Sequence, residues 1–258
     1  MKSTLIKYTL VGAVLIGLTQ TACVKKADGV LNGEKKLSDK SMIQVYMAMV
    51  NPSRNYIYVN NAAVNGASIT QGTVFPGSGP GFAIDGGFKY FLIRDTLTAT
   101  TQVPLSFSND FQAGKNYTIF VYDTTTAPQQ RTVQTDIVVP TDNTARLRFG
   151  NFVYSPTAPP AVDIFSKKLN TNIFTNVPVS QVTGFIPYNT DVTDTFYVRS
   201  TGTGVNLQNY TSTGTPVDII AVLTPRAKRS YTLVFRGGYR ATQLTATTVR
   251  TLSTFINY

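Results

Sequence analysis

Few residues of this chain could carry out acid–base or nucleophilic chemistry. The sequence contains no histidine, the side chain that most often serves as a general base or a metal ligand near neutral pH. Its single glutamate is Glu34 and its single cysteine is Cys23, and both lie close to the N-terminus. A hydrolytic site would therefore need paired aspartates or a serine and a lysine.

The aspartates are better explained as local capping residues. Asp191 and Asp194 are three residues apart in the Thr- and Asn-rich segment 189–195, where short polar side chains bond to the nearby backbone. We interpret them in this way rather than as a cation site. Asp163 leads from a proline-rich loop into a strand, and we expect it to accept hydrogen bonds from backbone N–H groups at that joint. The sequence therefore predicts that the protein is not an enzyme. We expect no catalytic residue, no metal site and no cofactor.

Cys23 follows a segment with the order of a secretory signal peptide. Lys2 and Lys7 come before an apolar run at residues 8–18, and small residues follow the run, directly before the cysteine. The run is shorter than the ~20 residues that cross a bilayer, so we expect residues 1–22 to be removed. The junction resembles a bacterial lipoprotein box, although Gln20 stands where such boxes usually have leucine. We predict lipidation of Cys23 and an outer-membrane lipoprotein on the periplasmic or cell-surface face; the alternative is a plain secreted protein.

Basic residues are concentrated in the second half of the chain. Residues 43–144 hold five Lys and Arg against six Asp, whereas residues 145–258 hold eleven against four. Such a surplus attracts polyanions, and the candidate contacts with an anionic glycan are Arg226, Lys228, Arg229, Arg236 and Arg240. The alternative is a solvated face whose charges protect exposed strand edges. Nucleic acid is not an expected partner, because an exported lipoprotein meets little of it.

Tyr56 and Tyr58 alternate with apolar residues in the segment 55–59, so both tyrosines lie on one face of a strand. An exposed pair would form an aromatic contact for a sugar ring or for a protein. Alternatively, the pair packs beneath a loop or against a second module. Exposure of the two rings would favour a carbohydrate-binding protein.

From residue 43 onward the sequence has the pattern of short β-strands. Runs of Val, Ile, Phe, Tyr and Thr are separated by Gly, Pro, Asn and Thr every 8–14 residues. The run 88–93 is apolar on both faces, which is typical of a central, covered strand, and residues 146–150 alternate Arg146 and Arg148 with apolar residues. The polar residues 24–42 show no apolar period, and we interpret residues 23–42 as a lipidated, flexible tether. The chain after the tether is predicted to be all-β, of the sandwich class.

Two stretches of the chain resemble each other. Residues 113–123 and 227–237 align without gaps, with a tyrosine and two alternate apolar residues at matching positions. In the second stretch we expect Leu233 and Phe235 in a core. We infer two tandem antiparallel β-sandwich modules of the Ig-like class, residues 43–142 and 143–258, after the signal peptide and the tether.

The segment 145–165 carries Ser155-Pro156, Ala158-Pro159 and Val162-Asp163 after a strand of alternating basic and apolar residues. This order resembles the opening of a bacterial extracytoplasmic family, the domain of unknown function 4397, found in lipoproteins of the Bacteroidota type. The resemblance covers most of residues 145–258, and the first half looks like a degraded second copy. It implies cell-envelope β-sandwich modules and no accepted catalytic residue.

We therefore expect a lipid-anchored cell-envelope protein with a non-catalytic binding or assembly role at the bacterial surface. Its expected partners are the membrane, reached through the N-terminal lipid, and an anionic glycan or an envelope protein. Two alternatives stay open. One is a carbohydrate-binding accessory protein, and the other is an enzyme of unfamiliar type whose polar residues converge in a pocket.

Overall fold

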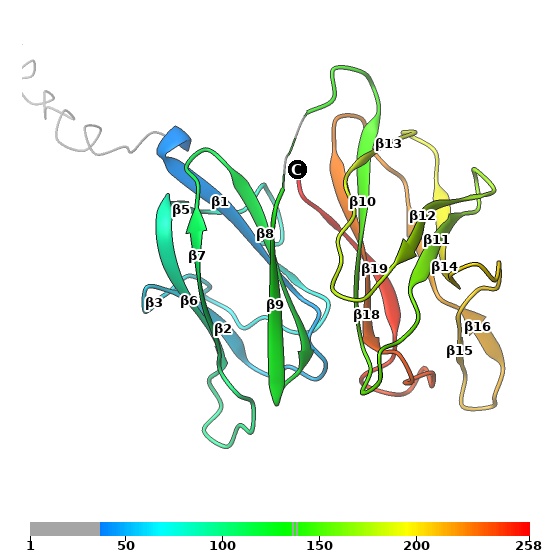
Figure 1. Cartoon of the computed structure of the whole chain (residues 1–258), viewed down its shortest axis with the longest axis horizontal. Coiled ribbons are helices and arrows are strands. Elements are labelled where there is room, and N and C mark those ends of the chain that lie inside the picture. The colour runs from blue at the N-terminus through cyan, green and yellow to red at the C-terminus, as the bar shows by residue number, and fades with distance from the viewer. Residues whose placement is uncertain (1–36, 136, 138) are drawn as a thin grey trace, which may run out of the picture. The chain divides into compact units, whose positions relative to one another are not determined.

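The structure, a computed structural model, describes residues 37–135, 137 and 139–258. These residues form β-strands and one short 3-10 helix, η1 (Leu37–Asp39), so the prediction of an all-β protein is confirmed (Figure 1). None of the helices in this part of the chain is long and apolar enough to cross a membrane. The predicted signal peptide, the lipidation site Cys23 and residues 24–36 of the predicted tether lie outside the described residues.

Residues 37–42, which the sequence assigned to the flexible tether, belong to the fold. Residues 37–42 form η1 and the start of β1 (Lys40–Met47). Lys40 lies opposite Asp85 in a strand pair and forms an ion pair with it at 2.6 Å, and the buried Ser41 hydroxyl donates to the backbone oxygen of Gln112 at 2.8 Å. Polar residues at the start of β1 therefore find partners distant in sequence, which a local hydrophobic pattern does not reveal.

The first sandwich consists of sheets A and B. Sheet A joins β4 (Val74–Phe75), β1, β8 (Asn116–Thr124) and β9 (Ala127–Gln134) in that order, with β5 (Phe82–Asp85) also paired to β1. Sheet B has the order β3 (Ala62–Ala63), β2 (Asn55–Val59), β6 (Gly87–Asp95) and β7 (Leu105–Phe111). Alternate residues of each strand face inward, and the core between the sheets includes Ile43, Ile57, Phe91 and Ile119.

The second sandwich consists of sheets C and D and a small ribbon. Sheet C has the order β13 (Ile186–Tyr188), β10 (Ala145–Tyr154), β18 (Ser230–Gly238) and β19 (Thr251–Ile256). Sheet D has the order β12 (Thr171–Val177), β11 (Val162–Ser166), β14 (Asp194–Ser200) and β17 (Ile220–Leu223), and β15 (Gln208–Tyr210) pairs with β16 (Pro216–Asp218). Leu233 and Phe235 are fully buried in the core between sheets C and D, which confirms that prediction.

Most strand pairs are antiparallel, as predicted, but each sandwich of the described chain contains a parallel pair. β1 pairs with β8 so that Ile43 lies opposite Tyr117, and β10 pairs with β18 so that Leu147 lies opposite Tyr231. Parallel neighbours require a long connection between them. In the first sandwich that connection includes the strands of sheet B, and in the second it includes those of sheet D. The predicted antiparallel sandwiches are therefore found, each with one parallel pair that the sequence did not indicate.

The two tyrosines that align in the sequence make the same contact. The Tyr117 hydroxyl accepts a hydrogen bond from the backbone N–H of Gln112, and the Tyr231 hydroxyl accepts one from the backbone N–H of Arg226, each at 3.0 Å. Each tyrosine therefore fixes the loop that precedes its own strand, and a buried hydroxyl is satisfied in each case.

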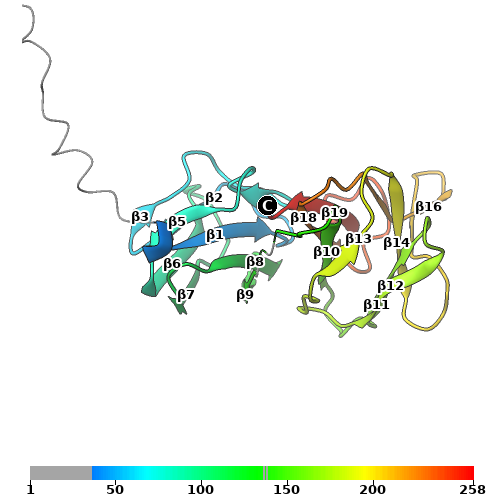
Figure 2. The same cartoon turned by 90° about the horizontal axis from the view of Figure 1, so that it is seen from above.

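Sheets A and C pack against each other through the faces that point away from their own cores. Tyr46, Ala48 and Phe120 of sheet A form an apolar cluster with Phe152, Val234 and Phe255 of sheet C. The rings of Phe120 and Phe152 stack with centroids 4.4 Å apart. Figure 2 shows β8 beside β10 at this interface. The outer face of sheet C is therefore a second buried surface, which an alternating strand pattern does not predict.

Arg148 of β10 carries its guanidinium into this interface, where the residue is 2% exposed. Its Nε donates to the Thr232 hydroxyl at 2.8 Å, and its Nη2 donates to the hydroxyls of Thr118 at 2.9 Å and Thr135 at 3.2 Å. The ring centroid of Phe185 lies 4.6 Å from the guanidinium carbon. Burial lowers the pKa of Arg148 to about 9, so the side chain stays charged at neutral pH.

Hydrogen bonds continue from Arg148 along the interface. The Thr232 hydroxyl donates to the side-chain oxygen of Asn257 at 2.5 Å, and the Asn257 amide donates to Oε1 of Gln44 at 3.1 Å. The Gln44 amide in turn donates to the backbone oxygens of Gly79 and Ile256, at 3.1 and 3.0 Å. Buried hydrogen bonds as well as apolar packing therefore join the two sandwiches, and such satisfied networks favour one fixed arrangement.

Candidate functional site

The five basic residues singled out in the sequence do not gather on one surface. Arg226, Lys228 and Arg229 are exposed in the loop before β18, whereas Arg236 and Arg240 lie at and beyond the far end of that strand. At about 3.3 Å per residue, β18 separates its two ends by roughly 26 Å. The structure thus brings three of the five residues together and leaves two elsewhere.

Arg236 and Arg240 have local contacts of their own. Arg236 is half-buried, and its guanidinium packs so closely over Gly72 that a Cβ built on the glycine would lie 2.4 Å from Nη2. Gly72 belongs to the first sandwich, so Arg236 lies between the sandwiches rather than in solvent. Arg240 is exposed, and its Nη2 donates to the Thr157 hydroxyl at 3.1 Å.

A cavity of about 420 Å³, called here the junction cavity, lies beside the three clustered basic residues. One wall is the loop 77–80 of the first sandwich, and the other consists of Arg226, Arg229, Tyr231, Ile256 and Tyr258. The Arg229 guanidinium carbon lies 5.9 Å from the ring centroid of Tyr258. Arg226 forms an exposed ion pair with Asp191 at 3.0 Å. The junction cavity therefore presents two guanidinium groups and a tyrosine ring.

A second cavity, of about 400 Å³, includes residues of the segment that carries the family resemblance. Ser155, Ala158 and Pro159 line it together with Tyr122 and Asp123 of β8. Burial raises the pKa of the Asp123 carboxyl, and a hydrogen bond from Thr124 partly offsets this effect. The proline-rich loop thus contributes to a cleft against the first sandwich.

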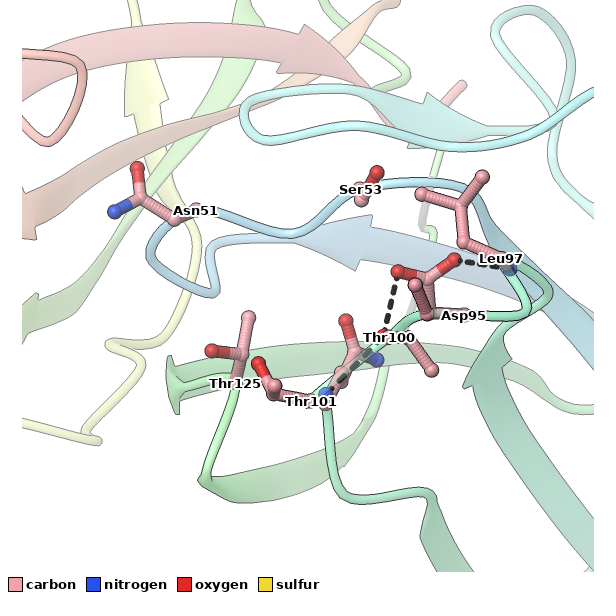
Figure 3. Close-up of a pocket in the computed structure, with 9 residues that line it drawn as sticks. Asn51, Ser53, Asp95, Leu97, Thr100, Thr101 and Thr125 are labelled. Carbon is pink, nitrogen blue, oxygen red and sulfur yellow. Dashed lines mark hydrogen bonds between the residues drawn. The ribbon is translucent and has the colours of Figure 1, made fainter.

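A smaller polar cavity of about 220 Å³ lies next to the loop after β6 (Figure 3). In Figure 3 the Asp95 carboxylate points to Leu97 and Thr100, and it accepts hydrogen bonds from the Leu97 N–H at 2.9 Å and from the Thr100 hydroxyl at 2.8 Å. The Thr100 hydroxyl also accepts a bond from the Gln102 N–H at 3.1 Å. These polar groups hold the loop in shape, and a single carboxylate is too few for paired acid–base work.

Tyr56 and Tyr58 are half-buried on the outer face of sheet B. The Arg94 guanidinium carbon lies 5.0 Å from the ring centroid of Tyr58 and partly covers it. Two further rings on this sheet are more open, because Phe88 is 73% exposed and Tyr90 is 39% exposed.

The prediction that residues 88–93 are covered on both faces is therefore wrong. Sheet A, rather than sheet B, packs on the second sandwich, and the outer face of β6 remains in solvent. Apolar residues on both faces of a run therefore fit an exposed aromatic face as well as a covered strand, and Phe88 and Tyr90 form such a face here.

The buried carboxylates Asp163 and Asp194 accept hydrogen bonds within the fold, but the prediction that Asp163 caps its own loop–strand joint is wrong. Asp163 accepts hydrogen bonds from the backbone N–H groups of Asn176 at 2.7 Å and Gly202 at 3.4 Å, and these belong to neighbouring segments rather than to its own loop. Asp194 accepts bonds from the Ser166 and Tyr188 hydroxyls and from two backbone N–H groups. Within the described residues, no three His, Cys, Asp or Glu side chains lie close enough together to hold a metal ion.

Comparisons with known proteins add no relative. The sequence matches no protein-family model, and a search of curated proteins finds no match to it. The resemblance to the domain of unknown function 4397 therefore stays a prediction that rests on the motif around Ser155 and Asp163.

Proposed function

We propose that this chain is a lipid-anchored cell-envelope protein with a non-catalytic binding or assembly role at the bacterial surface. The observation that carries the proposal is the single cysteine, Cys23, placed directly after an export signal. The described fold begins at Leu37, so residues 24–36 connect it to the proposed lipid. We place the protein on the outer membrane, with the β-sandwiches facing the periplasm or the cell exterior.

The non-catalytic part of the proposal is supported by how the chain uses its polar residues. The sequence has no histidine, and the oxygens of the buried carboxylates Asp163 and Asp194 accept hydrogen bonds from nearby backbone and side-chain groups. The buried hydrogen bonds between sheets A and C hold the two sandwiches in one arrangement. A fixed pair of modules is suited to presenting one continuous binding surface, because little ordering is required when a partner binds.

Metabolic labelling with an alkyne fatty acid tests the anchor. We expect label on the wild-type chain and none on a Cys23→Ser variant, which should also leave the membrane fraction. Thr21→Ser is the matched control, since it changes the neighbouring sequence and keeps the cysteine. Equal labelling of wild type and Cys23→Ser would refute the lipid anchor.

A second candidate, a carbohydrate-binding accessory protein, is favoured by the exposed rings of Phe88 and Tyr90. On the neighbouring strand β7, Asp110 and Ser108 lie directly opposite these two residues. Aromatic rings beside hydroxyl and carboxylate groups provide both the apolar contact and the hydrogen bonds that a sugar requires. Glycan-array binding that is lost in Phe88→Ala would support this candidate, and binding that persists in that variant would argue against this face.

A further inference from the structure

The junction cavity is the described site whose chemistry is least explained by folding. Arg229 and Tyr258 line it, and among the described residues no carboxylate forms an ion pair with Arg229. Arg226 has a carboxylate partner, Asp191, but this pair is exposed on both sides. Exposed ion pairs contribute little to stability, so an anionic ligand can replace Asp191 at a small cost in free energy. Both guanidinium groups are therefore available to a ligand.

The surroundings of the cavity carry a positive surplus of side-chain charge. Arg146 lies opposite Ser230 in the β10–β18 pair, and the exposed Lys228 lies between Arg226 and Arg229 in the loop. The acidic side chain that contacts this loop is Asp191, which pairs with Arg226. Three basic side chains of the loop against this one carboxylate favour an anionic ligand, and concave walls concentrate that attraction.

The two walls of the cavity are held in place before any ligand binds. The Gln44 amide donates to the backbone oxygen of Gly79 in one wall and to that of Ile256 in the other, at 3.1 and 3.0 Å. On the same side, the Tyr231 hydroxyl accepts the backbone N–H of Arg226 at 3.0 Å and fixes the start of the basic loop. A preformed site loses less entropy on binding than a site that must be ordered.

The combination of groups selects the class of ligand. A guanidinium pairs with a carboxylate through two parallel N–H bonds, and the ring of Tyr258 offers an apolar face against which a sugar ring can pack. The volume of about 420 Å³ lies in the range of small-molecule sites, ~300–1,000 Å³. We propose that the junction cavity binds an acidic sugar, a glycan residue whose carboxylate is held by Arg229 and Arg226 and whose ring lies against Tyr258. This inference rests on the proposed binding role and names its ligand class.

Binding of the full-length lipoprotein, purified in detergent, to a soluble polyuronate tests the inference. We expect Arg229→Gln to weaken binding by about ten- to hundredfold, the range for losing hydrogen bonds to a charged group. Arg240→Gln is the matched control, because it removes the same charge from an exposed position at the other end of β18. It should leave binding within about twofold, and the carboxyl-reduced polymer should bind weakly to every variant.

Equal losses in Arg229→Gln and Arg240→Gln would overturn the inference, since diffuse charge alone would then explain the binding. So would equal binding of the polyuronate and its carboxyl-reduced form, or binding to vesicles of anionic phospholipid without binding to polyuronate. Binding that Phe88→Ala abolishes and Arg229→Gln does not would refute the junction cavity while leaving a glycan-binding role intact. The lipid anchor is judged separately by the labelling of Cys23.

Discussion

Replacing Arg148 with methionine tests how the two sandwiches are held together. The guanidinium is buried between sheets A and C and donates to the hydroxyls of Thr232, Thr118 and Thr135. No carboxylate among the described residues forms an ion pair with it. Methionine has a similar length, carries no charge and would lie among the same rings as the arginine stem.

The expected magnitude follows from what the substitution removes and what it leaves behind. Burying an uncompensated ion costs several kcal/mol, and replacing buried charges by apolar groups of similar size is often neutral or stabilising by about 1–4 kcal/mol. The hydroxyls do not lose all partners, because Thr118 and Thr135 bond to each other at 2.8 Å and Thr232 donates to Asn257 at 2.5 Å. We therefore expect the free energy of unfolding of Arg148→Met to equal or exceed that of wild type.

Thr118→Val tests the same hydrogen bond from the side of the acceptor. It leaves the charged guanidinium in place and removes one of its acceptors, which costs about 1.5–3 kcal/mol for a bond to a charged group. In the Arg148→Met background there is no charge to satisfy, so the same substitution should cost less. The four proteins form a double-mutant cycle.

Urea unfolding at pH 7, monitored by circular dichroism, measures all four free energies. A coupling energy near zero would refute the view that Thr118 acts by holding Arg148. A free energy of unfolding lower in Arg148→Met than in wild type would refute the expectation and show that the arginine is a net source of stability.

Three further substitutions test the fold. Phe235→Ala should lower the free energy of unfolding by about 3–5 kcal/mol because the side chain is fully buried in the second core, and a urea midpoint close to wild type would contradict this. Gly237→Ala should cost more than about 1 kcal/mol in the same assay, since φ is +94° and the new Cβ would lie 2.4 Å from the Val249 carbonyl oxygen. For Asp194, burial raises the pKa, but hydrogen bonds from hydroxyl and backbone groups outweigh it and lower the pKa below its usual value. The carboxylate therefore stabilises the fold above about pH 4. The difference in free energy of unfolding between wild type and Asp194→Asn should shrink as the pH falls below that value. A difference that stays constant from pH 7 to pH 2 would refute a stabilising role for the Asp194 carboxylate.

The alternation of residues along strands made part of the fold predictable. Leu233 and Phe235 are buried because they share one face of β18, and such a face can be identified from a period of two within a single strand. The partners of Asp163 could not be inferred in this way, because its donors come from segments nine or more residues away in sequence. The predicted lipidation at Cys23 depends on sequence alone and stays a prediction.

Which outer faces become buried was decided by tertiary structure. The alternation in residues 146–150 predicts that Arg146 and Arg148 point to the face of β10 that is turned away from its own core. Both side chains lie on that face. Arg148 is nevertheless buried, because sheet A packs on this face. The alternating pattern of β6 likewise did not predict that Phe88 on sheet B would be exposed. The sequence also does not show whether the basic residues gather on one surface. In the structure they do not, because Arg226 and Arg236 are separated by most of the length of β18. A strand pattern records which side chains share a face, but the segments that cover that face are distant in sequence, and their approach depends on the free energy of packing the whole chain.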